Sequence, residues 1–177
     1  MKITSIKHLR TYLIGLGLGV LIVLAGYLYL YPTHFSPQAQ TARNMGVDPA
    51  AYVDSNRILA GVENGKKLTG DDYSRIVALT NYHSHNNVGW TIRVRAVEAL
   101  AGAASTPNAA AATSLTERML NSKSANVRQR AIATLWRLNR QDGRIAANKE
   151  LQDPDPYVRR MAHLLLTGLK LRPEGSR

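Results

Sequence analysis

The sequence predicts an all-α protein: a short right-handed α-solenoid of about three helix pairs, preceded by one transmembrane helix. Residues 12–31 form an apolar run without charge, and one nine-residue pattern recurs three times further along the chain. No stretch alternates apolar and polar residues as a half-buried strand would. Aromatic residues make up only 6% of the chain and alanine is common, which favours closely packed helices.

The composition limits the classes of function. A chain of 177 residues is long enough for about one domain with an appendage. Its 23 basic and 12 acidic residues give a net charge of +11, which favours anionic partners such as phospholipid surfaces, nucleic acid or acidic polymers. Cysteine is absent, which excludes disulfides, thiolate zinc sites and cysteine nucleophiles.

The first expected helix is a membrane anchor with the sequence YLIGLGLGVLIVLAGYLYLY, residues 12–31. Twenty helical residues rise about 30 Å, the thickness of a bilayer's hydrocarbon core. Tyrosines stand at both ends of the run, as in the aromatic belts of membrane helices. A cleaved signal peptide is the alternative, but its apolar core is usually about 7–15 residues long. We therefore expect an uncleaved anchor that contacts the lipid bilayer.

Charge asymmetry predicts the orientation of this anchor. Lys2, Lys7 and Arg10 precede the run, whereas the first basic residue after it is Arg43. The positive-inside rule then predicts a single-pass protein of a bacterial cytoplasmic (inner) membrane, with residues 1–11 cytoplasmic and the C-terminal domain extracytoplasmic. Gly15 and Gly19 form a GxxxG pair, which makes a homodimer through this helix an open alternative.

Residues 32–69 are expected to be a linker that contains two short helices. Ser36 and Asp48 each precede a proline, so they are capping residues for helices over about 37–45 and 49–60. Gly46 and Gly61 stand where C-terminal caps belong.

Similar capping signals predict the remaining helices. Thr69 and Asp72 are spaced as a capping box for a helix over about 70–83. Thr106, Ser124 and Asp155 are the expected starts of helices that end near 121, 138 and 170. The predicted helix pairs are 70–103, 107–138 and 142–170, and residues 171–177 form a tail.

The recurring pattern is IRVRAVEAL from Ile92, VRQRAIATL from Val127 and VRRMAHLLL from Val158. The second copy follows the first by 35 residues (127 − 92) and the third follows the second by 31 (158 − 127), within the range of solenoid repeats. Positions one, five and nine share one face of a helix, so each copy predicts an apolar stripe with a small residue at its centre.

The segment Asp155-Pro156-Tyr157-Val158-Arg159 resembles the D-P-x-V-R-x-x-A motif that opens the second helix of each HEAT-like repeat. The likeness is to short bacterial HEAT-like repeats of the phycobilisome-lyase type and covers about residues 70–170. It implies a right-handed, armadillo-like α-solenoid in which the repeated Arg93, Arg128 and Arg159 reach carboxylates or carbonyls of neighbouring units. A ladder of anion-binding guanidinium groups is the functional alternative for these arginines.

A second basic group is the candidate binding site. It holds one tryptophan and five arginines, which suit phosphate groups or an acidic protein surface. A solvated basic face is the alternative. The candidate residues are Arg128, Arg130, Trp136, Arg137, Arg140 and Arg144.

Enzymatic and metal chemistry are not expected. His83 and His85 form an H-x-H pair, but no nearby residues complete a ligand set, so we expect no metal. Asp153 and Asp155 both precede prolines, where helix capping explains them. No nucleophile motif or phosphate-binding loop is present in the sequence, and no catalytic residue or cofactor is expected.

The leading functional prediction is therefore a non-enzymatic, membrane-anchored scaffold that binds another protein, itself membrane-associated. The first alternative is a basic module for anionic lipid or an envelope polymer. Nucleic-acid handling or a glycosylase activity would require a domain that faces the cytoplasm, which the charge rule disfavours. A chromophore lyase is suggested only by the name of the resembled family.

Overall fold

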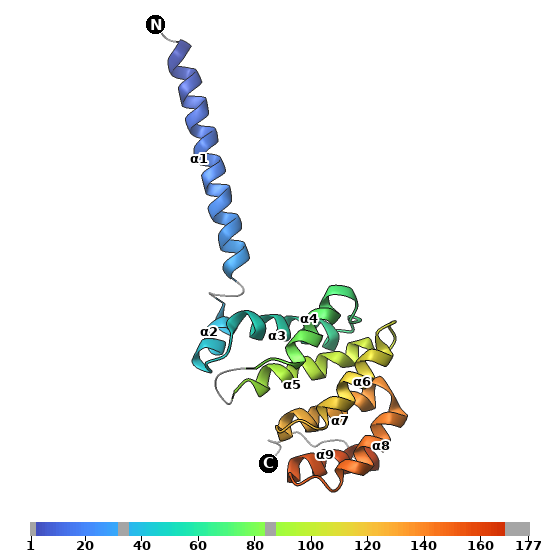
Figure 1. Ribbon diagram of the computed structural model, residues 1–177. Helices are drawn as coiled ribbons and strands as arrows, with labels where there is room; N and C mark the ends of the chain where they lie inside the picture. The colour runs from blue at the N-terminus through green and yellow to red at the C-terminus, as the bar shows by residue number, and fades with distance from the viewer. Residues whose placement is uncertain (1–2, 32–35, 84–87, 169–177) are drawn as a thin grey trace.

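The computed structural model describes residues 3–31, 36–83 and 88–168, with side chains from Leu16 onward. Within these ranges the chain is all-α and no strand is present, which confirms the predicted fold class for this part of the protein. Helix α1 (Ile3–Leu30) projects away from the other helices, which pack together into one body (Figure 1).

The helices that follow α1 are short and lie close to the predicted ranges. A short 3-10 helix, η2 (Leu100–Ala103), continues the fifth helix. The α-helices are α2 (Pro37–Asn44), α3 (Pro49–Glu63), α4 (Gly70–Thr80), α5 (Trp90–Ala99), α6 (Ala109–Met119), α7 (Ala125–Leu138), α8 (Arg140–Glu150) and α9 (Pro156–Thr167).

Three of the predicted helix starts carry side-chain caps. The hydroxyl of Ser36 accepts the N–H of Ala39 at 3.2 Å, and the carboxylate of Asp48 accepts the N–H of Ala50 at 3.0 Å. Asp155 caps α9 in the same way. In each case a proline fills the first turn, where its missing N–H leaves no bond unmade.

One predicted cap and one predicted helix end were wrong. Thr69 directly precedes α4, as predicted, but its side chain makes no capping bond, and the carboxylate of Asp72 accepts from Arg57 and Lys66. Gly61 does not end α3, which continues to Glu63; the left-handed turn falls at Gly65, where φ is 84°.

Helices that are next but one in the chain pack side by side. Helix α3 contacts α5, α5 contacts α7, and α7 contacts α9. Between them, α4, α6 and α8 each pack on the helix that follows. In Figure 1 this gives a continuous body in which α2 and α3 lie nearest to α1, and α8 and α9 lie at the far end.

The core follows the repeated pattern. The predicted inward face is confirmed at positions one and five, which are fully buried in all three copies, whereas position nine is buried in the first two copies and half-buried in the third. The buried residues are Ile92, Val127 and Val158 at position one, Ala96, Ala131 and Ala162 at position five, and Leu100 and Leu135 at position nine.

Residues 37–63, within the expected linker, are packed helices. Tyr52 of α3 is buried in one cluster with Ile92 of α5, and Ile58 and Val62 are buried in another with Leu100. A Cβ at position 102 would lie 2.6 Å from a methyl carbon of Val62, so only glycine permits this close approach. Helix α3 thus covers the N-terminal side of α5.

The predicted localisation is corrected by the structure. In the described part of the chain, no helix has both the length and the apolar character that a membrane crossing requires. The predicted single-pass inner-membrane localisation is therefore wrong on this finding. Residues 12–15 of the predicted span lie outside the described side chains.

Candidate functional site

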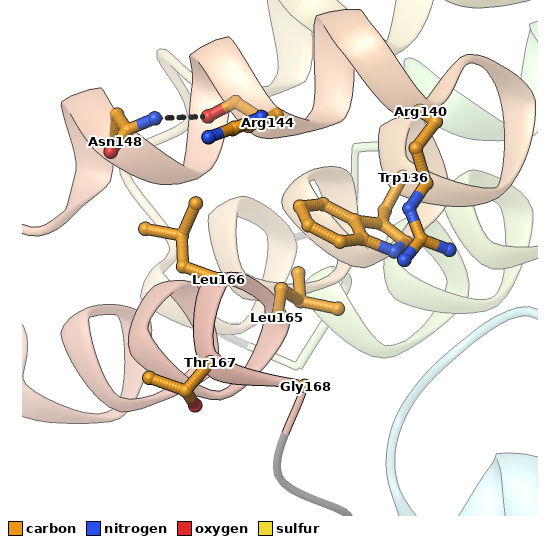
Figure 2. Close-up of a pocket in the computed structure, with 8 residues that line it drawn as sticks. All are labelled: Trp136, Arg140, Arg144, Asn148, Leu165, Leu166, Thr167 and Gly168. Atoms are coloured by element: carbon orange, nitrogen blue, oxygen red, sulfur yellow. Dashed lines mark hydrogen bonds between the residues drawn. The ribbon is translucent and has the colours of Figure 1, made fainter.

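A cavity of about 550 Å³ lies where α7, α8 and α9 meet (Figure 2). One wall is α8, the opposite wall is the C-terminal half of α9, and a tryptophan from α7 lies between them. We call this cavity the α8–α9 groove. Its lining residues are Trp136, Arg140, Arg144, Asn148, Leu165, Leu166, Thr167 and Gly168.

The turn between α7 and α8 places an arginine over the tryptophan. Asn139 is extended (φ −146°, ψ 114°), and its side chain caps α8 by accepting the N–H of Gln141 at 2.9 Å. The guanidinium carbon of Arg140 then lies 4.7 Å from the centre of the Trp136 ring, within the range of a cation–π contact. This contact holds a cation at the mouth of the groove.

Gly143 allows α8 to cross α7 closely at the same point. A Cβ on this residue would lie 2.4 Å from the Cα of Trp136 and 2.5 Å from its backbone nitrogen. Such distances to backbone cannot be relieved by a side-chain rotation, so glycine is required here. The close crossing fixes where Trp136 stands relative to the arginines of α8.

Arg140 and Arg144 lie one helical turn apart on α8, and both are exposed. Neither takes part in any ion pair among the described residues. The side-chain amide of Asn148 donates to the carbonyl oxygen of Arg144 at 2.9 Å. This wall of the groove therefore presents two positive charges that no described carboxylate neutralises.

The wall formed by α9 is apolar. Leu165 and Leu166 are half-buried and face the groove from the last turns of the helix (Figure 2). The hydroxyl of Thr167 donates to the carbonyl oxygen of His163 at 2.8 Å. Gly168 ends α9 in the left-handed conformation, with φ of 67°. The groove thus combines a basic wall with an apolar one.

The structure brings together three of the six candidate residues, Trp136, Arg140 and Arg144. It places the other three elsewhere. Arg130 pairs with Glu98 of α5 at 3.2 Å, and Arg137 is exposed on α7 but does not line the groove. Arg128 belongs to a different, structural contact.

Arg128 makes a bidentate ion pair with Asp153, the residue two positions before the cap of α9. Its Nε and Nη2 donate to the two carboxylate oxygens at 2.7 and 2.8 Å, and its Nη1 donates to the carbonyl of Ser122 at 2.8 Å. The Asp153 side chain is only 3% exposed. Hydrogen bonds from Arg128 lower the pKa of Asp153 to about 2. The expected reach of this arginine to a neighbouring carboxylate is confirmed.

The equivalent arginines differ in their surroundings. Arg159 donates through Nη1 to the carbonyls of residues 153 and 154, the same offsets at which Arg128 meets residues 122 and 123. The Nε of Arg93 is buried and has no hydrogen-bond partner in the described part of the chain. Aligning the copies at Arg128 and Arg159 places Ser122 of the second copy where the third has Asp153.

Two other predictions concern residues that are only partly described. His85 lies outside the described residues, and among those described no three His, Asp or Glu side chains are grouped as metal ligands. The side chain position of Gly15 also lies outside, while a Cβ at Gly19 would meet nothing within 4 Å.

Sequence reasoning missed the apolar wall and the partner of Arg128. Leu166 was predicted to point into the core as the ninth position of the third copy, no prediction was made for Leu165, and Asn148 stands in a polar segment without any motif. Asp153 was interpreted as a cap, but its carboxylate pairs with Arg128 and accepts the N–H of Asp155 at 2.7 Å. The sequence signal that could have found this pair is the position of Asp153, six residues before Arg159 of the third copy of the pattern, since Arg128 is the equivalent arginine of the second copy.

In comparisons with known proteins, no family model, no curated protein and no solved structure matches this chain.

Proposed function

We propose that the chain is a HEAT-like repeat protein and a non-enzymatic scaffold, which binds a segment of another protein in the α8–α9 groove. The observation that carries this proposal is the pair of guanidinium groups of Arg140 and Arg144, which line a cavity beside Trp136 and pair with no carboxylate among the described residues. Tryptophan and arginine are the residues that contribute most often to protein-binding hot spots. A cavity of about 550 Å³ is within the usual range for a bound group.

The arrangement of the helices supports the repeat part of the proposal. A stack of helix pairs would place every second helix side by side, and α3, α5, α7 and α9 make contacts of that kind. The matching carbonyl contacts of Arg128 and Arg159 support the same reading. Helix α3, which also starts with Asp-Pro, would be one more second helix at the N-terminal side of the stack.

A substitution tests this stack. If the second and third copies are equivalent, Ser122→Asp supplies Arg93 with the carboxylate that Asp153 supplies to Arg128. We expect the free energy of unfolding to rise by about 1 kcal/mol or more, because a buried guanidinium nitrogen gains a partner. The variant should therefore unfold at a higher denaturant concentration. Ser122→Asn, which lacks the charge, is the control. A destabilised Ser122→Asp variant would contradict the equivalence of the copies.

The lining of the groove favours binding over catalysis. The polar groups of its described lining residues are two guanidiniums, one indole N–H, one amide and one hydroxyl, and none of these exchanges a proton readily near neutral pH. No carboxylate, imidazole or amine lines the groove among the residues that the structure describes. This set of groups can hold an anion in place but provides no general acid or base.

A peptide-display library tests the scaffold function. The purified full-length chain, held in a mild detergent because α1 exposes apolar side chains, selects peptides that are then assayed one by one. We expect enriched peptides whose binding is lost in the double variant Arg140→Glu, Arg144→Glu. Selection of no peptide, or of peptides that bind the double variant equally well, would refute the groove as a protein-binding site.

A second function, binding of a nucleic acid or another anionic polymer, is favoured by the net charge of +11. Such binding would weaken steeply with salt, because each phosphate contact releases a counterion. A single-stranded oligonucleotide in the same assay separates this function from the first.

A further inference from the structure

We infer that the α8–α9 groove recognises an extended peptide segment in which an apolar residue stands between two acidic residues. This inference rests on the proposed scaffold function and names the chemistry of the segment that the groove would take. The spacing of the cations, the apolar wall opposite them and the contact with Trp136 each contribute to it.

The spacing of the two cations fits alternate residues of an extended chain. Arg140 and Arg144 are four residues apart on α8, so their Cβ atoms lie about 5–6 Å from each other. An extended peptide rises about 3.3 Å per residue, which places side chains i and i+2 about 6.6 Å apart on one face. Two carboxylates at these positions can each meet one guanidinium.

The opposite wall fits the residue between them. In an extended chain, successive side chains point to opposite faces, so residue i+1 points away from α8. A segment that lies along the groove would direct this side chain towards Leu165 and Leu166 of α9 (Figure 2). An apolar side chain there would be removed from water, at a gain of about 25 cal/mol for each Å² buried.

The environment of the cations strengthens their pairing with carboxylates. Trp136 covers one face of the Arg140 guanidinium, which keeps the cation in place and leaves its planar edge free to bond an acid. Arginine can donate two parallel hydrogen bonds to one carboxylate, and such charge-assisted bonds are stronger than neutral ones. The oxygen of the Asn148 amide has no bond among the described residues and can accept a backbone N–H.

A peptide fits this groove better than a nucleic-acid strand. A strand needs cations along a continuous path, because most of its affinity comes from phosphate contacts. Arg128 and Arg130, which would extend the row of cations along α7, are paired with Asp153 and Glu98. Among the described lining residues, the cations of the groove are a pair that faces an apolar wall.

The test uses fluorescein-labelled nine-residue peptides, the full-length chain and fluorescence anisotropy at physiological salt. The central sequence of the first peptide is Asp-Leu-Asp in a Gly/Ser background. We expect saturable binding, at least tenfold weaker for an Asn-Leu-Asn peptide and at least threefold weaker for a Leu-Asp-Asp peptide, in which the acids are adjacent. Equal affinity for the three peptides would overturn the inference.

Variants assign the binding to the groove. Arg140→Glu with Arg144→Glu should weaken the Asp-Leu-Asp peptide at least tenfold. The matched control, Arg118→Glu with Arg137→Glu, has the same change of net charge on exposed arginines outside the groove and should change binding less than threefold. Equal losses in the two double variants would indicate a general charge effect and overturn the assignment. Circular dichroism on both variants checks that they fold.

The outcomes separate this inference from the proposed function. If library peptides bind in the groove but lack the acid–apolar–acid pattern, the scaffold function holds and the inferred segment chemistry is wrong. If no peptide of any kind depends on Arg140 and Arg144, both proposals fail. Tighter binding of a single-stranded oligonucleotide, dependent on these two arginines, would overturn the inference in favour of a nucleic acid.

Discussion

Removal of the Arg128 guanidinium by Arg128→Met should destabilise the fold more than the loss of an exposed ion pair would. The variant keeps an apolar stem of similar length but leaves Asp153, 3% exposed, as a buried carboxylate without its cation. Breaking a buried ion pair from one side costs about 3–5 kcal/mol. We expect a loss near the lower end, about 3 kcal/mol at pH 7, because Asp153 also accepts the N–H of Asp155.

The pKa of Asp153 supplies a second magnitude for the same contact. It falls from 3.8 to about 2, chiefly through the Arg128 hydrogen bonds, and this change corresponds to roughly 2 kcal/mol. Because the folded pKa is lowered, this stability is present above pH 3.8 and is lost as the pH falls towards 2. The difference between wild type and Arg128→Met should therefore be about 1 kcal/mol smaller at pH 3 than at pH 7.

Urea denaturation followed by circular dichroism measures both quantities. Arg130→Met is the matched control, because its pair with Glu98 is more exposed (43% and 22%) and should contribute less than about 1 kcal/mol. Asp153→Asn, which keeps the size of the side chain, should remove the same pH dependence. A loss below 1 kcal/mol for Arg128→Met, or equal losses at pH 3 and pH 7, would refute the reasoning.

Two further substitutions test the environment of the groove and of Asp153. Gly143→Ala places a Cβ against the backbone of Trp136 and should lower the free energy of unfolding by about 3 kcal/mol in thermal or urea unfolding. The control Gly61→Ala, within α3 and near only a flexible lysine stem, should raise it by about 0.5 kcal/mol. Equal effects of the two substitutions would contradict the close crossing of α7 and α8. Burial, together with the nearby Asp153, raises the pKa of Glu150 above 4.5, so its ionisation destabilises the fold as the pH rises through the raised pKa. Glu150→Gln should therefore gain stability relative to wild type between pH 4 and pH 7 in urea titrations, and a constant difference over this range would contradict a raised pKa.

The pattern of the sequence predicted most of the helical fold, because caps and apolar spacing are local signals. Asp48 and Asp155 begin α3 and α9 as expected, since a capping carboxylate and a following proline act within one turn. The burial of Ala96 and Ala131 also followed from spacing alone. Caps and apolar spacing act within a single helix, so they do not depend on how segments distant in the sequence pack together.

The sequence predicted the basic and aromatic residues of the groove but not its apolar wall. The residues Trp136, Arg140 and Arg144 stand close together in the sequence, and their basic and aromatic character pointed to binding. Leu165 and Leu166 could not be recognised as the opposite wall, because their position beside α8 depends on how α8 and α9 pack. Tertiary packing also separated Arg128 and Arg130 from the group, since Arg128 pairs with Asp153 in the turn between α8 and α9, and Arg130 pairs with Glu98 of α5.

The apolar N-terminal segment gave the clearest disagreement. Hydrophobicity over residues 12–31 predicted a membrane span, and the described side chains from Leu16 to Leu30 are indeed apolar and exposed. The prediction is nevertheless wrong, because no helix in the described part of the chain is both long and apolar enough to cross a membrane. Local hydrophobicity therefore identified the composition of this helix but did not settle what it does.

The most direct test of the groove is an NMR titration of the full-length chain with the Asp-Leu-Asp peptide, observing the indole N–H of Trp136 and the Nε–H of the arginines. We predict saturable shifts at Trp136, Arg140 and Arg144, with the Nε–H of Arg128 and Arg137 unchanged. Saturable shifts at Arg137 without any at Trp136, or no shift at the three groove residues, would contradict the assignment of the α8–α9 groove as the binding site.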